Sequence, residues 1–247
     1  MLEKSKKILV VSDNSELMVF LKDEVLRQDC ADSDFFCYAY SKSNEKPSLM
    51  IEVGACEVDV NNPDFIANAK EKYCLIISVH CKQIFPLKLV GSVICVNFHP
   101  GLNPYNRGWY PQVFSILNKK PIGATLHIMD GQIDHGDIID QTEVKAFMMD
   151  TSFDLYQRVV DAEKVLIKRN ICSLVNLSFR SRKVKNNGNY NSINDFNELC
   201  CLDLNSTGTM REHIDIMRAL THADFRNAYF VDEFGDKVYL RLFLEKK

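Results

Sequence analysis

The sequence predicts an open α/β domain with a mostly parallel, Rossmann-like sheet, followed by a small C-terminal α+β appendage that ends in a hairpin. Three apolar runs, 6–12, 73–81 and 92–99, are nearly continuous, which is typical of parallel strands covered on both faces. Segments with helical periodicity alternate with such runs over about 175 residues. A chain of 247 residues, 46% of them hydrophobic, can bury a core of this kind.

The remaining elements follow from periodicity and capping. Residues 14–28 and 150–177 each carry an apolar stripe at helical spacing, so we expect a helix in both places. Thr151 and Asp154 form a capping-box pattern at the start of the longer helix. The other expected elements are short strands at 34–41 and 48–54, a helix at 110–120, and strands at 121–130 and 137–146.

The composition changes near residue 178 and becomes basic, rich in Asn and poor in apolar residues. We interpret residues 1–178 as the catalytic domain and 179–194 as a connector. Residues 195–247 then form the appendage. Within it, Thr209 and Glu212 are placed as a capping box before a helix, and apolar and polar residues alternate near the chain end, which predicts a hairpin over 227–245.

Charge and cysteine content narrow the function. The net charge of −3 gives no drive toward nucleic acid, and no apolar stretch is long enough for a transmembrane helix or shaped like a signal peptide. Nine cysteines are scattered with no C-x-x-C pair, which favours free thiols in the cytoplasm over a disulfide framework or a metal site. We therefore expect no metal, no nucleic-acid partner and no membrane partner.

Polar residues follow the apolar run at 92–99, where ligands of open α/β sheets bind. Asn97 and His99 share one face of that strand, and such a pair could stabilise an oxyanion and accept a proton. Downstream, "MDGQIDHGDII" contains Asp134, which could orient the His99 ring. Gly and Pro could equally hold these residues in an ordinary loop and a polar hairpin, and the residues alone leave both interpretations open.

Known nucleotide-binding motifs are missing from the sequence. The first predicted strand is followed by "SDNSEL" and not by G-x-G-x-x-G, so a dinucleotide cofactor is not expected. The sequence also has no P-loop and no G-x-S-x-G elbow.

Two ordered motifs carry a resemblance to a known family. "NFHPGLNPYNRG" and "GATLHIMDGQIDHGDII" resemble the Asn-x-His-Pro and Asp-x-Gly-Asp signatures of the 10-formyltetrahydrofolate-dependent formyltransferases, and Asp134 lies 35 residues after His99 as in that family. "LIISVHCKQIFP" also resembles the family's preceding strand and turn, so the likeness spans about residues 5–175. The resemblance implies that His99 accepts a proton, Asn97 stabilises an oxyanion and Asp134 supports His99.

The resemblance also implies N10-formyltetrahydrofolate as co-substrate, with its pterin near residues 78–84 and 128–134. The cofactor-binding residues expected on this basis are Ser78, His80, Lys82, Gln83, Met129 and Asp130. A nucleotide-linked sugar needs cations for its diphosphate and apolar surface for its base. The corresponding candidates are Asp13, Asn14, Tyr105, Arg107 and Trp109.

Three classes of substrate occur in this family. Methionyl-tRNA formyltransferases are longer and end in a basic domain, and glycinamide ribonucleotide transformylases typically carry Ser where Gly101 stands here. "NPYNRGWYPQVFSILNKKPIGATLH" and the C-terminal segment look most similar to formyltransferases of dTDP-4-amino-4,6-dideoxyhexoses, which act in surface polysaccharide (O-antigen) synthesis. This class implies a homodimer through the C-terminal hairpin, although "THADFRNAY" departs from the expected Pro-rich turn. A catalytically silent binding module is the alternative from outside enzymology.

Overall fold

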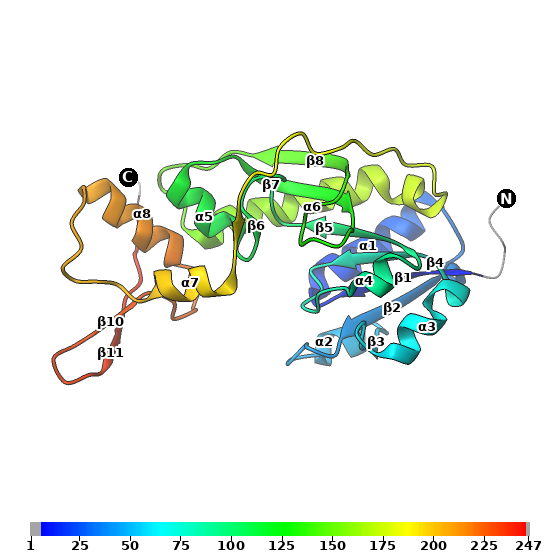
Figure 1. Cartoon of the computed structure of the whole chain (residues 1–247), viewed down its shortest axis with the longest axis horizontal. Helices are drawn as coiled ribbons and strands as arrows, with labels where there is room; N and C mark the ends of the chain where they lie inside the picture. The colour runs from blue at the N-terminus through cyan, green and yellow to red at the C-terminus, as the bar shows by residue number, and fades with distance from the viewer. Residues whose placement is uncertain (1–5, 246–247) are drawn as a thin grey trace.

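A computed structural model describes residues 6–245, and the first and last residues of the predicted domains, 1–5 and 246–247, lie outside the described part (Figure 1). A seven-stranded sheet with the order β3-β2-β1-β4-β5-β7-β8 forms its centre. Its strands are β1 (Lys7–Ser12), β2 (Phe36–Ser41), β3 (Cys56–Val58), β4 (Tyr73–Val79), β5 (Ile94–His99), β7 (Ile122–Ile128) and β8 (Ile138–Val144).

The first five strands in chain order are parallel, and β7 and β8 add antiparallel pairs at one edge. The predicted mostly parallel α/β sheet is therefore confirmed. The chain order changes direction beside β1, because β2 lies on one side of this strand and β4 on the other. The carboxyl ends of β1, β4 and β5 consequently open on the edge where ligands of such sheets bind.

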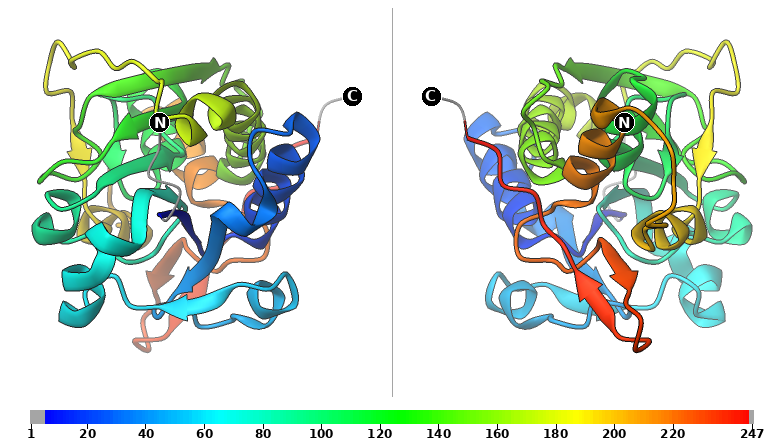
Figure 2. Two further views of the ribbon diagram at one scale, coloured as in Figure 1. Left: turned by 90° about the vertical axis from the view of Figure 1, so that its right-hand side faces the viewer. Right: turned by 90° about the vertical axis from the view of Figure 1, so that its left-hand side faces the viewer.

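Helices cover both faces of the sheet (Figure 2). On one face, α1 (Ser15–Gln28) and α6 (Ser152–Val175) share a core cluster with alternate residues of the central strands. On the other face, α3 (Pro63–Lys72) and α4 (Leu87–Val90) cover the remaining apolar side chains of β1 and β4. Burial on both faces explains why these strands read as continuous apolar runs.

The C-terminal part packs on the end of the sheet domain through a third core. Its helices are α7 (Ile193–Cys200) and α8 (Met210–Leu220), and its hairpin consists of β10 (Tyr229–Val231) and β11 (Lys237–Tyr239). Phe196, Ala219 and Leu220 are buried there against α5 (Pro111–Asn118) and the first turns of α6. The hairpin projects from this end of the molecule, opposite the end where the described chain begins (Figure 1).

The predicted connector makes specific contacts. It follows the outer edge of the sheet, where Arg182 pairs with Ile138, and it contains β9 (Tyr190–Asn191). This strand pairs in parallel with β6 (Arg107–Gly108), which belongs to the loop after β5. The connector therefore holds the loop after β5 in place through the pairing of β9 with β6.

Some predicted elements were wrong in type or extent. Residues 48–54 form α2 (Ser48–Glu52) and a turn, and the expected strand is instead β3, because a short apolar run does not distinguish helix from strand. The hairpin pairs only from Tyr229 to Tyr239, since the alternating residues after it have no opposite strand. Prediction missed α3, α7 and the short 3-10 helix Ser33–Phe35, although Asn62 with Pro63 and Ser192 with Asp195 are recognisable caps.

The prediction that all cysteines are free thiols was also wrong. The C-terminal ends of α1 and α6 lie side by side and bring Cys30 and Cys172 together as a disulfide, with 5.2 Å between their Cα atoms. Sequence spacing could not show this, because 142 residues separate the two cysteines. In residues 6–245 no helix is long and apolar enough to cross a membrane.

Candidate active site

Two polar loops meet at the carboxyl end of β5. Asn97 and His99 lie on β5, and Asp134 lies in the loop between β7 and β8. The Asp134 carboxylate is 3.4 Å from His99 Nδ1 and accepts a hydrogen bond of 3.2 Å from Asn97 Nδ2. The structure thus brings together the three residues that the sequence motifs predicted, in one small cluster.

A second histidine, which prediction missed, completes this cluster. His127 on β7 is the register partner of Asn97. Its Nε2 lies 3.4 Å from Asp134 Oδ1, the oxygen that also accepts from Asn97, whereas His99 faces Oδ2. His127 Nδ1 donates to the Ile128 carbonyl over 2.9 Å, because that oxygen can only accept. Asp134 is therefore flanked by two imidazoles and one carboxamide.

His99 is oriented as a neutral base. Its side chain is 4% exposed, and burial, opposed in part by the Asp134 carboxylate, lowers the pKa of His99 to about 4. Since the carboxylate only accepts, Nδ1 carries the proton and Nε2 presents a lone pair. Within the described residues Nε2 has no hydrogen-bond partner, so a ligand can occupy that position.

Asp134 is held as an anion by its neighbours. Burial opposes the charge, but the attraction of His99 and His127 and a hydrogen bond from the Gly108 N–H outweigh it and hold the pKa of Asp134 well below its usual range. Asn103, in the loop after β5, donates from its side chain to the Asp134 carbonyl over 2.9 Å and so fixes the loop that carries Asp134. The Asn103–Pro104 peptide is cis. The carboxylate therefore points at the two rings in a fixed direction.

Glycine is required directly beside the reactive ring. A Cβ atom added at Gly101 would lie 2.4 Å from His99 Nε2 and 3.1 Å from the Pro111 ring. A serine at this position, which is typical of the glycinamide ribonucleotide class, would therefore displace His99 in this backbone geometry. Gly136, in the second motif, likewise leaves room for the Ile128 carbonyl, 1.8 Å from its would-be Cβ.

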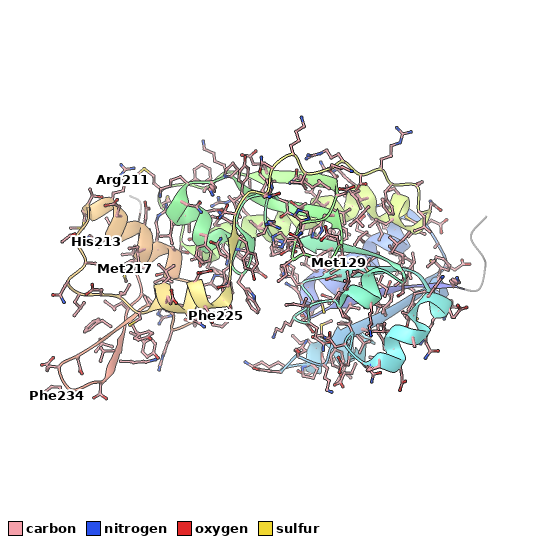
Figure 3. All side chains as sticks on the ribbon, in the orientation of Figure 1. Met129, Arg211, His213, Met217, Phe225 and Phe234 are labelled. Carbon is pink, nitrogen blue, oxygen red and sulfur yellow. A yellow bond between two sulfur atoms is a disulfide. The ribbon has the colours of Figure 1, made fainter. Side chains whose placement is uncertain are left out.

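The cluster opens into a cavity of about 740 Å³ between the sheet domain and the C-terminal part. Figure 3 shows Met129 on the sheet side and Phe225 on the C-terminal side, and both residues line the cavity. All six expected cofactor-binding residues also line it: Ser78, His80, Lys82, Gln83, Met129 and Asp130. Gln83 is nevertheless occupied, since its amide bonds Asp59 and the Val60 N–H.

Among the expected substrate-binding residues, only Trp109 lines the cavity, where it is 40% exposed. The Asp13 carboxylate is saturated, because it accepts from Ser41 and from the Lys82 N–H. Arg107 turns away and donates to the Ile133 carbonyl over 3.2 Å. Asn14 caps α1, and Tyr105 also lies outside the lining.

Prediction missed most of the C-terminal wall of the cavity. This wall consists of Tyr110, Ser152, Phe153, Tyr156, Phe196, His222, Phe225 and Asn227. The aromatic rings pack against one another. The centroid of the His222 ring lies 5.4 Å from those of Phe153 and Tyr156, and the centroids of Tyr110 and Phe196 lie 4.3 Å apart. No sequence signal links these residues, because they come from four separate segments that meet only in the fold.

Comparison with known proteins gives the class and then the family. Residues 6–171 match the model described as formyl transferase, and residues 195–246 match the N-formyltransferase dimerization C-terminal domain. Together with the fold, these matches define an enzyme that transfers a one-carbon group. The chain belongs to the formyl transferase family.

Individual relatives agree with this assignment. The chain is 46% identical over 180 residues to a dTDP-4-amino-4,6-dideoxyglucose formyltransferase of Mycobacterium tuberculosis, covering 73% of this chain and 77% of the relative. A sugar N-formyltransferase structure from a Shewanella species is 46% identical with a TM-score of 0.95, over 98% of this chain and 99% of that one. WlaRD, a sugar 3N-formyl transferase solved with dTDP and 5-N-formyl-THF, shares the fold at 22% identity and a TM-score of 0.74, over 91% of this chain and 82% of that one.

Proposed function

We propose that this enzyme formylates the C4 amino group of dTDP-4-amino-4,6-dideoxyglucose, with N10-formyltetrahydrofolate as the donor. The observation that carries the proposal is the cluster of Asn97, His99 and Asp134, which opens into a cavity of about 740 Å³. The 46% identity to a relative with this named activity supports the choice of sugar. A role in surface polysaccharide synthesis remains a prediction.

The chemistry follows from the orientation of His99. The substrate amine attacks the formyl carbon, and His99 Nε2 accepts the proton that the amine loses. Negative charge develops on the formyl oxygen, where Asn97 Nδ2 stabilises it with its second N–H, which otherwise faces His127 Nε2 at 3.5 Å. The bond from carbon to N10 of the folate then breaks, and the proton passes from His99 to N10. Asp134 keeps Nδ1 protonated and stabilises the transient imidazolium.

We place the two substrates on opposite walls. The folate occupies the sheet side, along Ser78, His80, Met129 and Asp130, where exposed Lys82 is close enough for the glutamate carboxylates. The nucleotide occupies the aromatic C-terminal side, which offers flat apolar surface for a base. This placement transfers the nucleotide-binding role from Arg107 and Tyr105 to the residues of the C-terminal wall.

We further propose a homodimer formed through the C-terminal part, in a chain divided into residues 1–178, 179–194 and 195–247. The two family matches leave the connector between them and describe the second region as a dimerization domain. Apolar side chains are exposed on it, including Phe234, 83% exposed at the hairpin turn, and Phe243, 85% exposed. Seven unpaired cysteines support a cytoplasmic location.

The test is a formyl-transfer assay with N10-formyltetrahydrofolate and a panel of nucleotide-linked sugars that carry a C3 or a C4 amine. We expect turnover with dTDP-4-amino-4,6-dideoxyglucose, and loss of nearly all turnover in His99→Asn. Absence of turnover on every dTDP-linked amine would contradict the proposal. Transfer to glycinamide ribonucleotide, or binding of both ligands without chemistry, would establish one of the alternatives instead.

A further inference from the structure

A buried acid–base pair that the chemical step of formyl transfer does not use adjoins the cavity, and only its His80 ring lines it. His80 directly follows β4, and its ring Nε2 lies 2.9 and 2.8 Å from the two oxygens of Glu163 on α6. The Glu163 side chain is fully buried, and the His80 side chain is 14% exposed. A buried carboxylate is costly unless it is paired, so this pair has a defined structural or functional role.

The other nitrogen of His80 faces a cavity residue. His80 Nδ1 lies 3.5 Å from the hydroxyl of Tyr156, which also belongs to α6 and lines the cavity. Tyr156 and Glu163 are seven residues apart and therefore share one face of the helix. The His80 backbone has a φ of 56°, which non-glycine residues rarely adopt, and its carbonyl accepts a hydrogen bond of 3.3 Å from the Asp13 N–H.

The protonation state of His80 determines the direction of the Tyr156 hydroxyl. In the neutral ring, Nε2–H donates to Glu163, and Nδ1 accepts the phenol proton. In the charged ring, Nδ1–H donates to the phenol oxygen instead, and the phenol proton is directed elsewhere. Because Tyr156 lines the cavity, the cavity is then the open direction for that proton.

We propose that His80 is a positioning residue: its protonated ring, held by Glu163, directs the Tyr156 hydroxyl proton into the cavity to bind an acceptor oxygen of the nucleotide-linked sugar. The inference rests on the proposed function for the identity of that ligand. It makes Tyr156 a substrate-binding residue and gives Glu163 its role through His80. An oxygen of the diphosphate and an oxygen of the sugar offer the same hydrogen-bond chemistry.

Charges around the pair favour the protonated ring. The titratable and charged groups near the His80 ring or the Tyr156 hydroxyl are Asp13 and Glu16 after β1, Cys81 and Lys82 after β4, His99 on β5, Glu163 on α6 and His222 after α8. Burial works against a charged ring, but Glu163 outweighs it and holds the pKa of His80 above its ordinary value. Burial, with the nearby Glu163 charge, raises the pKa of Tyr156 to about 12, so its hydroxyl keeps its proton.

The test compares Tyr156→Phe, Glu163→Gln and His80→Asn with the wild type in steady-state kinetics. Because a hydrogen bond to a charged ligand is lost, we expect KM for the nucleotide sugar to rise about 10-fold or more in all three variants. In Tyr156→Phe and Glu163→Gln we expect kcat and KM for the folate to stay within about two-fold, because the His99 cluster and the folate wall are intact. Tyr38→Phe, which changes a tyrosine of β2 outside the cavity lining, is the matched control.

The pH dependence separates positioning from packing. Wild-type affinity for the nucleotide sugar, measured by calorimetry, is expected to weaken as pH rises through the pKa of His80, and the affinity of Tyr156→Phe to be independent of that titration. The same measurement with dTDP alone locates the acceptor oxygen. If Tyr156→Phe loses affinity for dTDP, the acceptor belongs to the nucleotide; if it keeps wild-type affinity for dTDP, the acceptor belongs to the sugar.

If Tyr156→Phe has the same KM for the nucleotide sugar as the wild type, and the same pH dependence of affinity, the proposal is overturned. If Glu163→Gln does not fold, Tyr156→Phe still decides, because it removes one oxygen from the cavity wall. A wild type that formylates a different nucleotide-linked amine would contradict the proposed function alone, and the same comparison would then be made with that substrate.

Discussion

Replacement of Asp134 by Asn tests the central electrostatic argument. The Asp134 carboxylate lies 3.4 Å from His99 Nδ1, and the two side chains are only 12% and 4% exposed. At this distance, with an effective dielectric constant of about 20, a carboxylate stabilises an imidazolium by about 5 kcal/mol. If between half and most of this stabilisation is present in the transition state, Asp134→Asn should lower kcat about 10²- to 10³-fold.

The same electrostatic attraction predicts the direction in which the pH profile of Asp134→Asn shifts. Asp134 raises the pKa of His99 against the larger effect of burial, which together leave it at about 4. Removal of the carboxylate should therefore move the acid limb of kcat/KM to lower pH, while the plateau falls. The measurement is the ratio of variant to wild-type rate at each pH from about 3 to 8, because the titration of the substrate amine cancels in that ratio.

Asp137→Asn is the matched control, since it neutralises a carboxylate in the same loop that does not line the cavity. We expect near wild-type rates for this variant. A plateau for Asp134→Asn within about three-fold of the wild type, or an acid limb shifted to higher pH, would refute the proposed role of Asp134.

Three further predictions follow from contacts around the site. Gly101→Ala places a methyl group 2.4 Å from His99 Nε2, so kcat should fall at least about 10-fold in steady-state assays, and an unchanged kcat would contradict the tight packing. His99 is buried and its pKa is lowered from 6.5 to about 4, so between these two pH values the ring is protonated in the unfolded chain but neutral in the folded protein. The free energy of unfolding in urea should therefore drop by about 2 kcal/mol from this residue between pH 7 and pH 5, and His99→Gln should lose that component of the drop. Arg218, 4% exposed, donates to the carbonyls of Phe147 and Asp150 and to Asp215, so Arg218→Met should cost about 3 kcal/mol in urea unfolding. Because α8 leads into the C-terminal wall, KM for the nucleotide sugar should rise more than KM for the folate.

The sequence predicted the juxtaposition of Asn97, His99 and Asp134 well because local geometry determines most of it. Strand alternation puts Asn97 and His99 on one face, and Asp134 sits in the tight loop of the next antiparallel pair. His127 was missed although a signal existed. Once residues 121–130 are taken as a strand paired with 92–99, a polar residue opposite Asn97 is expected, and His127 is that residue.

The C-terminal wall of the cavity, where we place the nucleotide, could not be predicted in the same way. Ser152 and His222, joined by a hydrogen bond of 2.9 Å, are 70 residues apart, and only the packing of α8 on α6 brings them together. The expected roles of Asp13 and Arg107 were inferred from charge near a strand end. In the structure both side chains instead satisfy buried partners, the Ser41 group and the Ile133 carbonyl. Tertiary packing determined these positions, and residue type alone did not.

The cavity holds two histidines that we assign opposite charge states, and the geometry of their carboxylate partners explains the difference. Asp134 divides its attraction among His99, His127, Asn97 and the Gly108 N–H at 3.2 to 3.4 Å, so His99 is not stabilised enough to overcome its burial. Glu163 instead has His80 Nε2 at 2.8 and 2.9 Å from its two oxygens. A shared, longer contact leaves His99 neutral and able to accept the proton from the amine. An undivided, shorter contact keeps His80 charged and able to donate, which binding of an oxygen-rich substrate requires.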